Sequence, residues 1–338
     1  MDDTKHFDLV RQRNRRFIRN LMRDYRQIGK ADLAEVSGLS FPTVSALLGE
    51  MLATGEVVLL DETQTRGGRP AGQYALAPLF RAGICAYITD MFLCLRVVDV
   101  FGETVFERRL PFPANDCEAA LSDAIRYVQK RFPTLDAMSL GLPGVVRDGR
   151  VLFLPSHPEL NGVDLHERLR QTFGIEVFLE NDVNAFVLAE RETWPSLFHF
   201  LRSDACSGSG ILIDGKLMRG SGGYAGEIEY LDLPLSGSHR TLNERLAMIA
   251  REYKDELYRR AVNQLISEVL VSVVCILNPA DVALSGFVLD DSDLTEISNL
   301  IKARLPQERS ARLHIVSDVE PLYFAGLLSI LGDYRNIQ

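Results

Sequence analysis

The sequence predicts a mixed α/β protein that consists of a small N-terminal module and a larger body. Apolar residues recur at helical spacing up to about residue 53, strands and helices alternate from about Leu79, and charge is unevenly divided. Residues 1–70 carry a net charge of +1, whereas the remaining 268 residues carry −10. A chain of 338 residues can bury two or three separate cores. We therefore expect one domain at 1–78 and a second, two-lobed domain at 79–338.

No apolar run of about 18 residues occurs, and the first residues, MDDTKHFDLVRQRNRR, are too polar for a signal segment. The sequence thus predicts neither a membrane span nor export, and we expect a cytoplasmic protein. Its cysteines form no CxxC pair and lie in apolar surroundings, which indicates reduced, buried thiols; they are Cys85, Cys94, Cys117, Cys206 and Cys275.

The module begins with an amphipathic helix. Apolar residues follow one another at helical spacing, with seven arginines between Arg11 and Arg26; the apolar residues are Val10, Phe17, Ile18, Leu21 and Met22. Such a cationic helix on an acidic body indicates that the module meets a polyanion. A solvated helix face is the alternative for the charge run alone.

Two shorter helices follow. One covers Ala31–Val36 and stops at Gly38, and the next is capped by Ser40 with Pro42 in its first turn. The third helix has a core-facing stripe that consists of Val44, Leu47, Leu48 and Met51. Thr43 and Ser45 remain on its other face, where small polar side chains can approach the edges of bases.

The segment EVVLLDETQTRGGRPAGQYALAP predicts two strands around a basic, glycine-rich turn. Three helices followed by such a hairpin are typical of a winged helix-turn-helix. We expect helix 41–51 to lie in the major groove of a double-stranded DNA operator, with Arg66 and Arg69 of the wing on phosphates or in a minor groove. A winged helix used for protein contact is the alternative, and it leaves the arginines unexplained.

The body starts with three strands, with a turn at Phe101 and Gly102, and continues with a helix at Cys117–Arg131. A buried strand at AMSLGLPGVV, a strand at IEVFLEND and a helix at VNAFVLAERE come next, and a second unit begins at LFHFLRSD and SGILIDGKLMRG. This order predicts a two-lobed actin-like, ribonuclease-H-like fold with lobes at about 79–195 and 196–338, the C-terminal segment returning to the first lobe. Ligands of such folds lie between the lobes.

Polar residues interrupt the apolar pattern where strand IEVFLEND meets the next helix: Glu180, Asn181, Asp182 and Asn184. A strand-to-helix junction by itself gives Asp182 a role as a helix N-cap. Contact with a ligand is the other interpretation, because carboxylates and amides can bond adjacent hydroxyl groups.

Several segments, in order, resemble the ROK family, which groups bacterial sugar-responsive repressors with sugar kinases. They are SGLSFPTVSALLGEML, RGGRPAGQYAL, GLPGVVRDGRV, ENDVNAFVLAE, IDGKLMRGSGGYAGEIEYL and LNPADVALSG. The resemblance implies that Asn181, Asp182 and Glu227 contact sugar hydroxyls, Asp182 matching the base of the kinases.

The nucleotide turns that the resemblance implies are altered. The first reads DMFLCLR from Asp90, with Phe92 and Leu93 where small residues are needed; the second has Asp204, Ala205 and Cys206; the third has Ser285, Gly286 and Phe287. Bulky or acidic side chains oppose phosphate binding. We therefore expect no kinase activity, no catalytic residue and no cofactor.

The family's zinc loop is also altered. Tyr230 stands where the family has histidine, no cysteine occurs between Cys206 and Cys275, and His239 alone cannot hold zinc. We expect no metal. Tyr230 stacks on a sugar face or fills the core, and Glu244 either replaces a sugar-contacting glutamate of the family or faces solvent.

The resulting hypothesis is a homodimeric or homotetrameric, DNA-binding repressor of carbohydrate uptake or catabolism genes that a sugar-type ligand releases from its operator. One alternative is a sugar kinase with an attached DNA-binding module. The other is a DNA-binding regulator with a vestigial sensor that answers to a protein partner. The apolar helix around YRRAVNQLISEVLVSVVCIL serves either as core or as a dimer surface.

Overall fold

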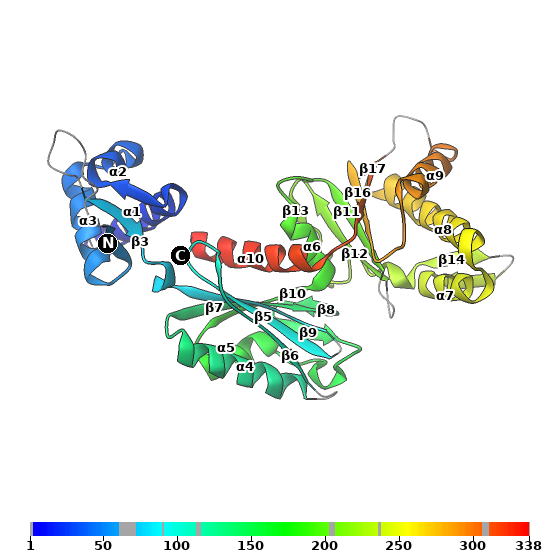
Figure 1. Ribbon diagram of the computed structural model, residues 1–338, viewed down its shortest axis with the longest axis horizontal. Coiled ribbons are helices and arrows are strands. Elements are labelled where there is room, and N and C mark those ends of the chain that lie inside the picture. The colour runs from blue at the N-terminus through cyan, green and yellow to red at the C-terminus, as the bar shows by residue number, and fades with distance from the viewer. Residues whose placement is uncertain are drawn as a thin grey trace.

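The computed structural model describes residues 3–60, 72–89, 91–112, 116–202, 207–235, 238–305 and 311–337. The N-terminal module lies at one end of the molecule, the second lobe of the body lies at the other, and the first lobe lies between them (Figure 1). The mixed α/β fold class predicted from the sequence is confirmed.

The module contains three helices and a small antiparallel sheet with the strand order β1-β3-β2. Gly38 ends the second helix in the left-handed conformation, and the Ser40 hydroxyl caps the third by accepting from the Thr43 N–H, as the sequence predicts. Its elements are α1 (Asp3–Tyr25), β1 (Gln27–Gly29), α2 (Lys30–Ser37), α3 (Phe41–Ala53), β2 (Val57–Leu60) and β3 (Gln73–Leu76). Strand β1 has no counterpart in the sequence prediction.

Helix α1 packs on the module through a narrower stripe than its apolar pattern indicates. Ile18 and Met22 are fully buried, as expected for an amphipathic helix, but Val10 and Phe17 are exposed. The reason is geometric, because Phe17 lies about 100° around the helix from Ile18 and turns away from the core.

The arginines of α1 also differ from expectation, because three of them pair with carboxylates inside the module. Arg11 meets Glu50, whereas Arg15 and Arg19 converge on Glu56, which is fully buried. These three guanidinium groups therefore hold α1 against the end of α3 and the start of β2. The assignment of the whole arginine run to a polyanion was wrong to that extent.

The first lobe has a five-stranded sheet with the order β10-β7-β4-β5-β6, in which β4, β7 and β10 are parallel. Helices α4 and α5 belong to the layer on one face, and α6 and α10 pack on the other. The elements of this lobe are β4 (Ala82–Ile88), β5 (Phe92–Val98), β6 (Thr104–Pro111), α4 (Cys117–Arg131), β7 (Leu135–Leu142), β8 (Val145–Arg147), β9 (Arg150–Phe153), α5 (Leu165–Phe173), β10 (Glu176–Asn181) and α6 (Asp182–Ala189).

The second lobe has the same strand order, which is β17-β16-β11-β12-β13 when it is written in the same direction. Its long helix α8 directs an apolar face into the lobe's core, while Ile276 at its end is exposed. The elements are β11 (Leu197–Arg202), β12 (Ser207–Ile213), β13 (Lys216–Leu217), β14 (Asp232–Leu235), β15 (Ser238–Thr241), α7 (Leu242–Glu252), α8 (Asp255–Ile276), β16 (Asp281–Ser285), α9 (Asp291–Lys302) and β17 (Arg312–Val316).

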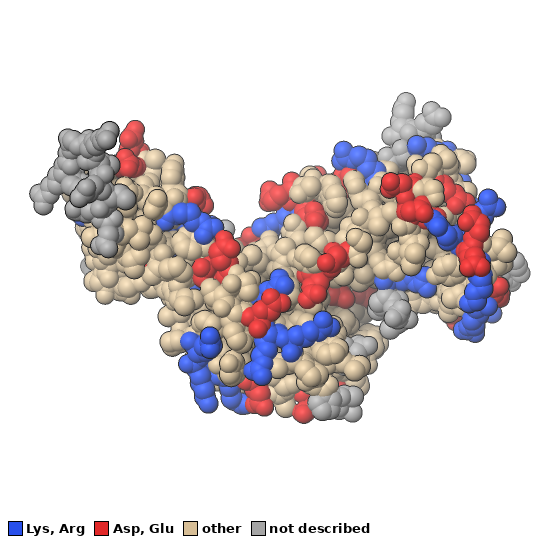
Figure 2. Space-filling model, in the orientation of Figure 1, with Lys and Arg blue, Asp and Glu red and all other residues tan. Residues whose placement is uncertain are grey.

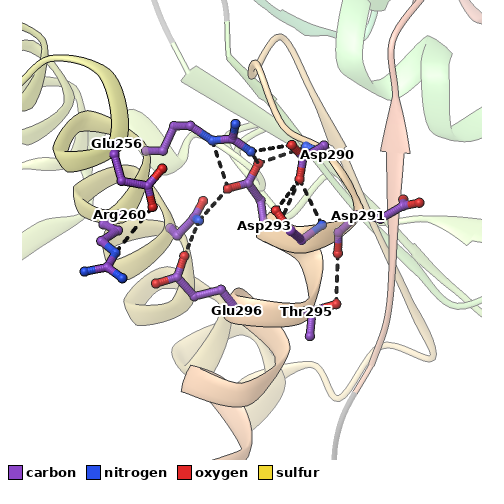
Figure 3. A network of polar contacts seen from close by, with 10 residues as sticks. Glu256, Arg260, Asp290, Asp291, Asp293, Thr295 and Glu296 are labelled. Atoms are coloured by element: carbon purple, nitrogen blue, oxygen red, sulfur yellow. Dashed lines mark hydrogen bonds and ion pairs between the residues drawn. The ribbon is translucent and has the colours of Figure 1, made fainter.

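A polar network joins α8 to the start of α9 (Figure 3). Arg259 of α8 pairs with Asp290, which caps α9, and with the buried Asp293. Asn263 donates to Asp293 at 2.8 Å and to Glu296 at 2.7 Å. The network fixes α9 on α8, far from the end of the lobe that faces the first lobe.

The last helix, α10 (Glu320–Ile337), follows β17 but packs on the first lobe, against β4, β7 and α6. Gly326 lies so close to α6 that a Cβ there would be 1.8 Å from the Ala185 carbonyl oxygen. At its far end, Arg335 donates to the Asp99 carbonyl at 3.0 Å and to Asp136 at 3.3 Å. One helix thus connects the inner edge of the first lobe with the neighbourhood of the module.

The module contacts the body at the turn between β5 and β6. Val100 joins the buried cluster of the module, and Arg26 lies 4.3 Å above the Phe101 ring while pairing with Glu103 at 3.2 Å. Burial of apolar surface at this turn, which we call the joint, holds module and body together.

The cysteines are free thiols in the described part of the chain. Cys85, Cys94 and Cys117 are free and buried as predicted, but Cys275 is exposed, which corrects the prediction, and Cys206 lies outside the described residues. Within the described ranges, no single helix is long and apolar enough to cross a membrane; α2 and α3 together pass by length and composition, with a bend of 117°.

The double pairing of Glu56 leads to a first prediction. In a Glu56→Gln variant the two guanidinium groups lose their buried counter-charge, and the module should lose about 3 kcal/mol of local stability. Hydrogen exchange of the α3 amides should then become about a hundredfold faster. Glu50→Gln removes the half-exposed partner of Arg11 and is the matched control, with an expected loss below about 1 kcal/mol. Equal exchange rates in the two variants would contradict a structural role for Glu56.

Candidate functional site between the lobes

The polar junction predicted from the sequence lies where β10 ends and α6 begins. Asn181 is the N-cap of α6: its Oδ1 accepts from the Asn184 N–H at 3.1 Å, and its Nδ2 donates to the Gly144 carbonyl at 3.1 Å. The alternative in which Asp182 caps the helix is therefore wrong. Asp182 is the first residue of α6, and its Oδ1 accepts from the adjacent Val183 N–H at 2.8 Å.

Glu227 of the second lobe is close enough to Asp182 to feel its charge. It follows Gly226, whose φ of +97° and close approach to the Ser209 carbonyl oxygen exclude any side chain at that position. Burial raises the pKa of Glu227 to about 7, with further contributions from the charges of Glu229 and Asp182. The charge of Asp182 in the first lobe thus acts on the carboxyl group of Glu227 in the second lobe.

Burial also raises the pKa of Asp182 to about 6, although hydrogen bonds from the backbone N–H groups and from Asn181 oppose this. A carboxyl group with a pKa near 6 accepts hydrogen bonds from hydroxyl groups when it is charged, and it can exchange protons near pH 6. The space between Asp182 and Glu227 therefore suits a neutral ligand with several hydroxyl groups better than an anion.

Two further groups of this site were not found from the sequence. Glu180 is buried and accepts from the Asn184 Nδ2 at 3.0 Å. It also pairs with Arg219 of the second lobe, so it joins the two lobes. Tyr323 of α10 is buried, and no described residue bonds its hydroxyl; the charge of Asp182 adds to burial in raising its pKa. Glu180 could have been suspected from its position in the polar junction, whereas nothing in the chain order relates Tyr323 to residue 182.

The other expected contacts occupy the loop after Glu227. Tyr230 is 59% exposed, so the alternative that it fills the core is wrong. Glu244 is exposed and its carboxylate accepts from the Thr241 N–H at 2.9 Å in a capping box at the start of α7. The capping box gives Glu244 a structural role, and its exposure agrees with the solvent-facing alternative.

The residues of this loop do not fit the zinc site that the family resemblance implies. His239 pairs with Asp232 at 2.9 Å on a two-stranded ribbon, and Tyr230 carries no metal-binding group of the required kind. Across the described part of the chain, no three His, Cys, Asp or Glu side chains converge as metal ligands.

In the described part of the first nucleotide turn, the backbone N–H groups of Thr89, Met91 and Phe92 are already bonded within the turn. The Thr89 hydroxyl accepts from the N–H groups of Met91 at 3.4 Å and Phe92 at 3.0 Å, and the Thr89 N–H donates to the Phe92 carbonyl at 2.8 Å. A phosphate-binding turn needs free N–H groups that point at the ligand. Asp90 itself lies outside the described residues.

The third nucleotide turn is filled by side chains. Phe287 packs edge-on against Phe200, with ring centres 5.1 Å apart. The Arg202 guanidinium lies 5.8 Å from the Phe287 ring centre and donates to the Tyr258 hydroxyl at 2.8 Å. Gly286 keeps its positive φ but is pressed against the Arg202 carbonyl. Asp204, Ala205 and Cys206 of the second turn lie outside the described residues.

The candidate DNA contacts lie on the module. The stripe Val44, Leu47, Leu48 and Met51 is buried, as predicted, and leaves Thr43 at a groove between α1 and α3. The Ser40 and Thr43 hydroxyls are 2.8 Å apart, and Lys30 donates to the Ser45 hydroxyl at 3.3 Å. Arg66 and Arg69 lie outside the described residues. On the face of the body in Figure 2, acidic and basic side chains are interspersed, which does not favour a polyanion there.

The fold and this site define a class of protein: a two-lobed body of the sugar-kinase type joined to a winged helix-turn-helix module. The model of the ROK family matches residues 89–241. Over these residues, which are less than half of the chain, the sequence is similar to the ROK family.

Named relatives agree with this assignment. The chain is 26% identical over 234 residues to the xylose repressor of Caldicellulosiruptor bescii and 25% identical over 246 residues to the DNA-binding transcriptional dual regulator NagC of Escherichia coli. These alignments cover 65% and 67% of this chain but only 58% and 59% of the relatives. The chain therefore matches about three-fifths of the length of these proteins.

Solved structures support the fold. A ROK family transcriptional regulator, a homolog of the E. coli MLC protein, superimposes with a TM-score of 0.66 at 17% identity and covers 97% of this chain and 98% of its own. The ROK hexokinase from Thermus thermophilus gives a TM-score of 0.58 at 20% identity and covers 75% of this chain and 99% of its own. The part that the hexokinase covers is smaller, which fits a body with an additional module.

The raised pKa of Asp182 leads to a second prediction. Its carboxyl group is charged in the unfolded chain above about pH 4, but burial disfavours that charge in the fold, so ionisation costs stability from about pH 4 to above pH 6. Asp182→Asn should therefore raise the free energy of unfolding at pH 8 by about 1 kcal/mol. The gain should shrink as the pH falls and vanish near pH 4.

Thermal unfolding of the free protein from pH 4 to pH 8 measures this effect. Asp148→Asn is the matched control, because Asp148 is highly exposed on the turn between β8 and β9 and its positive φ suits Asn equally well. A destabilised Asp182→Asn variant at pH 8 would show that the charge of Asp182 is stabilised in the fold.

Proposed function

We propose that the protein is a DNA-binding transcriptional regulator, a repressor of carbohydrate genes, whose body binds a sugar-type ligand between its lobes. One observation supports the proposal: the charge of Asp182, which follows the cap Asn181, acts on Glu227 of the other lobe in a chain that also has a winged helix-turn-helix. The names of the relatives, repressors that answer to xylose or N-acetylglucosamine, support it.

In this proposal the ligand closes the lobes and shifts a population of conformations. Asp182 and Glu227 lie on different lobes, so a ligand that bonds both carboxylates binds the closed arrangement more tightly than the open one. In a homodimer or homotetramer, the rotation moves the two modules away from the spacing of their half-sites and weakens operator binding.

We also propose that the bound sugar is not phosphorylated. The N–H groups of Met91 and Phe92 are bonded to Thr89, and Phe287 with Arg202 fills the adenosine-side turn. Positioning and stabilising a transferred phosphoryl group needs these turns open. The kinase alternative has the ROK hexokinase fold in its favour, but not the chemistry of the turns.

A third prediction concerns ligand binding. In a thermal-shift screen against monosaccharides, polyols, amino sugars and their phosphates, at least one neutral compound should raise the melting temperature. Asp182→Asn should abolish the shift, since the amide cannot replace the charged acceptor, while Asp148→Asn should retain it. No shift with any compound would favour the vestigial sensor and the protein partner.

The same compounds are incubated with ATP and magnesium to separate regulator from kinase. The expected result is no phosphorylated product, with a ROK hexokinase as positive control. Product formation that depends on Asp182 would overturn the regulatory interpretation of the site.

A fourth prediction concerns DNA. Selection of duplexes from a random pool with the full chain should enrich an inverted repeat, since two modules read two half-sites. Arg69→Ala should then weaken binding to all enriched duplexes about equally and reduce the slope of log affinity against log salt by about 1. Thr43→Ala should instead change the preferred bases. Arg126→Ala on α4 is the control, and an equal effect of Arg126→Ala would place DNA on the body.

A further inference from the structure

The joint between module and body holds an unusual number of arginines. A small cavity of about 10 Å³ lies there, lined by Arg19, Asn20, Arg23, Arg81, Val100 and Arg335. These side chains come from α1, from the residue before β4, from the turn between β5 and β6 and from the end of α10. The cavity has room for one group of the size of a water molecule.

Among the described residues, two carboxylates are shared by four arginines at or near this cavity: Arg15, Arg19, Arg81 and Arg335. Glu56 serves both Arg15 and Arg19. Asp136 likewise serves both Arg335, at 3.3 Å, and Arg81, at the longer distance of 3.7 Å. Among these four arginines and two carboxylates, two positive charges are left without a carboxylate of their own.

Asp99 is the third acidic residue near the joint, but its carboxylate is turned to the backbone. Its Oδ1 accepts from the N–H groups of Phe101 at 2.8 Å and Glu103 at 2.9 Å. Arg335 reaches only the main-chain carbonyl of Asp99. The Asp99 side chain therefore stabilises the turn and is not bonded to the guanidinium groups.

Two of the arginines retain unused donors. Arg335 is only 8% exposed, and its Nε has no hydrogen-bond partner among the described residues. The Arg81 side chain is partly buried, and its one ion pair among the described residues is the long contact with Asp136. Burial, together with the nearby charge of Arg19, lowers its pKa. Buried donors that face a cavity and like charges held together are both costly without a counter-ion.

We propose that the cavity binds one small inorganic anion of about chloride size, which bridges Arg81, Arg19 and Arg335. The anion supplies the missing negative charge and accepts the unused N–H groups, as a carboxylate would if the space admitted one. Sulfate and larger oxyanions are excluded by the size of the cavity. Because the lining residues come from both module and body, the ion is a counter-ion of the joint and is independent of the ligand between the lobes.

A solution test compares the melting temperature of the full chain in potassium chloride and in potassium gluconate at equal ionic strength. Chloride should raise it by about 2 °C. Arg81→Gln removes one guanidinium without breaking a short ion pair, and should lose most of this difference while melting higher than the native chain in gluconate. Arg126→Gln on α4, an exposed arginine with a partner at 2.9 Å, should keep the full difference, because general salt effects act on both variants.

A crystallographic test locates the ion directly. Crystals of the full chain soaked in bromide should show an anomalous peak within hydrogen-bond distance of Arg81 and Arg335. Bromide only at surface positions would overturn the proposal. An absent chloride effect in the native chain, or an undiminished one in Arg81→Gln, would overturn it as well.

Discussion

The close contact between α10 and α6 is the constraint on which the rest of the molecule depends. Only a glycine at position 326 allows the two helices to approach to the distance observed at the Ala185 carbonyl. The contact fixes α6, which begins with Asp182, against a helix that carries Tyr323 at one end and Arg335 at the other. Tyr323, near Asp182, and Arg335, at the joint, are therefore carried by one helix that packs on the first lobe.

Several charged groups of the structure lie close to others without a separate partner for each. Glu56 and Asp136 each hold two guanidinium groups, and the charge of Asp182 acts on Glu227 across the lobes. Positive charge is in excess around Glu56 and Asp136, and negative charge is in excess at Asp182 and Glu227. Like charges held close together raise the free energy of the fold. The two proposed ligands, an anion at the joint and a compound with several hydroxyl groups between the lobes, rest on these two excesses.

The altered nucleotide turns differ from phosphate-binding turns in their contacts as well as in their sequence. A threonine hydroxyl now bonds the N–H groups of the first turn, and an aromatic ring with a stacked arginine occupies the third. These replacements satisfy groups that a nucleotide would otherwise satisfy, so the lobes are stable without it.

The sequence by itself determined the fold class, the caps at Gly38 and Ser40 and the buried stripe of α3, because periodicity and turn chemistry are local. It also placed Asp182 at a strand-to-helix junction. Only the tertiary structure decided that Asn181 is the cap, that Glu180 pairs with Arg219, that Tyr323 lies beside Asp182, and that Arg15 and Arg19 share Glu56. The physical reason is that all these contacts except the local cap join residues about 40 to 140 positions apart. Which distant partner neutralises a charge depends on how the layers pack, and a pattern along the chain carries no information about that.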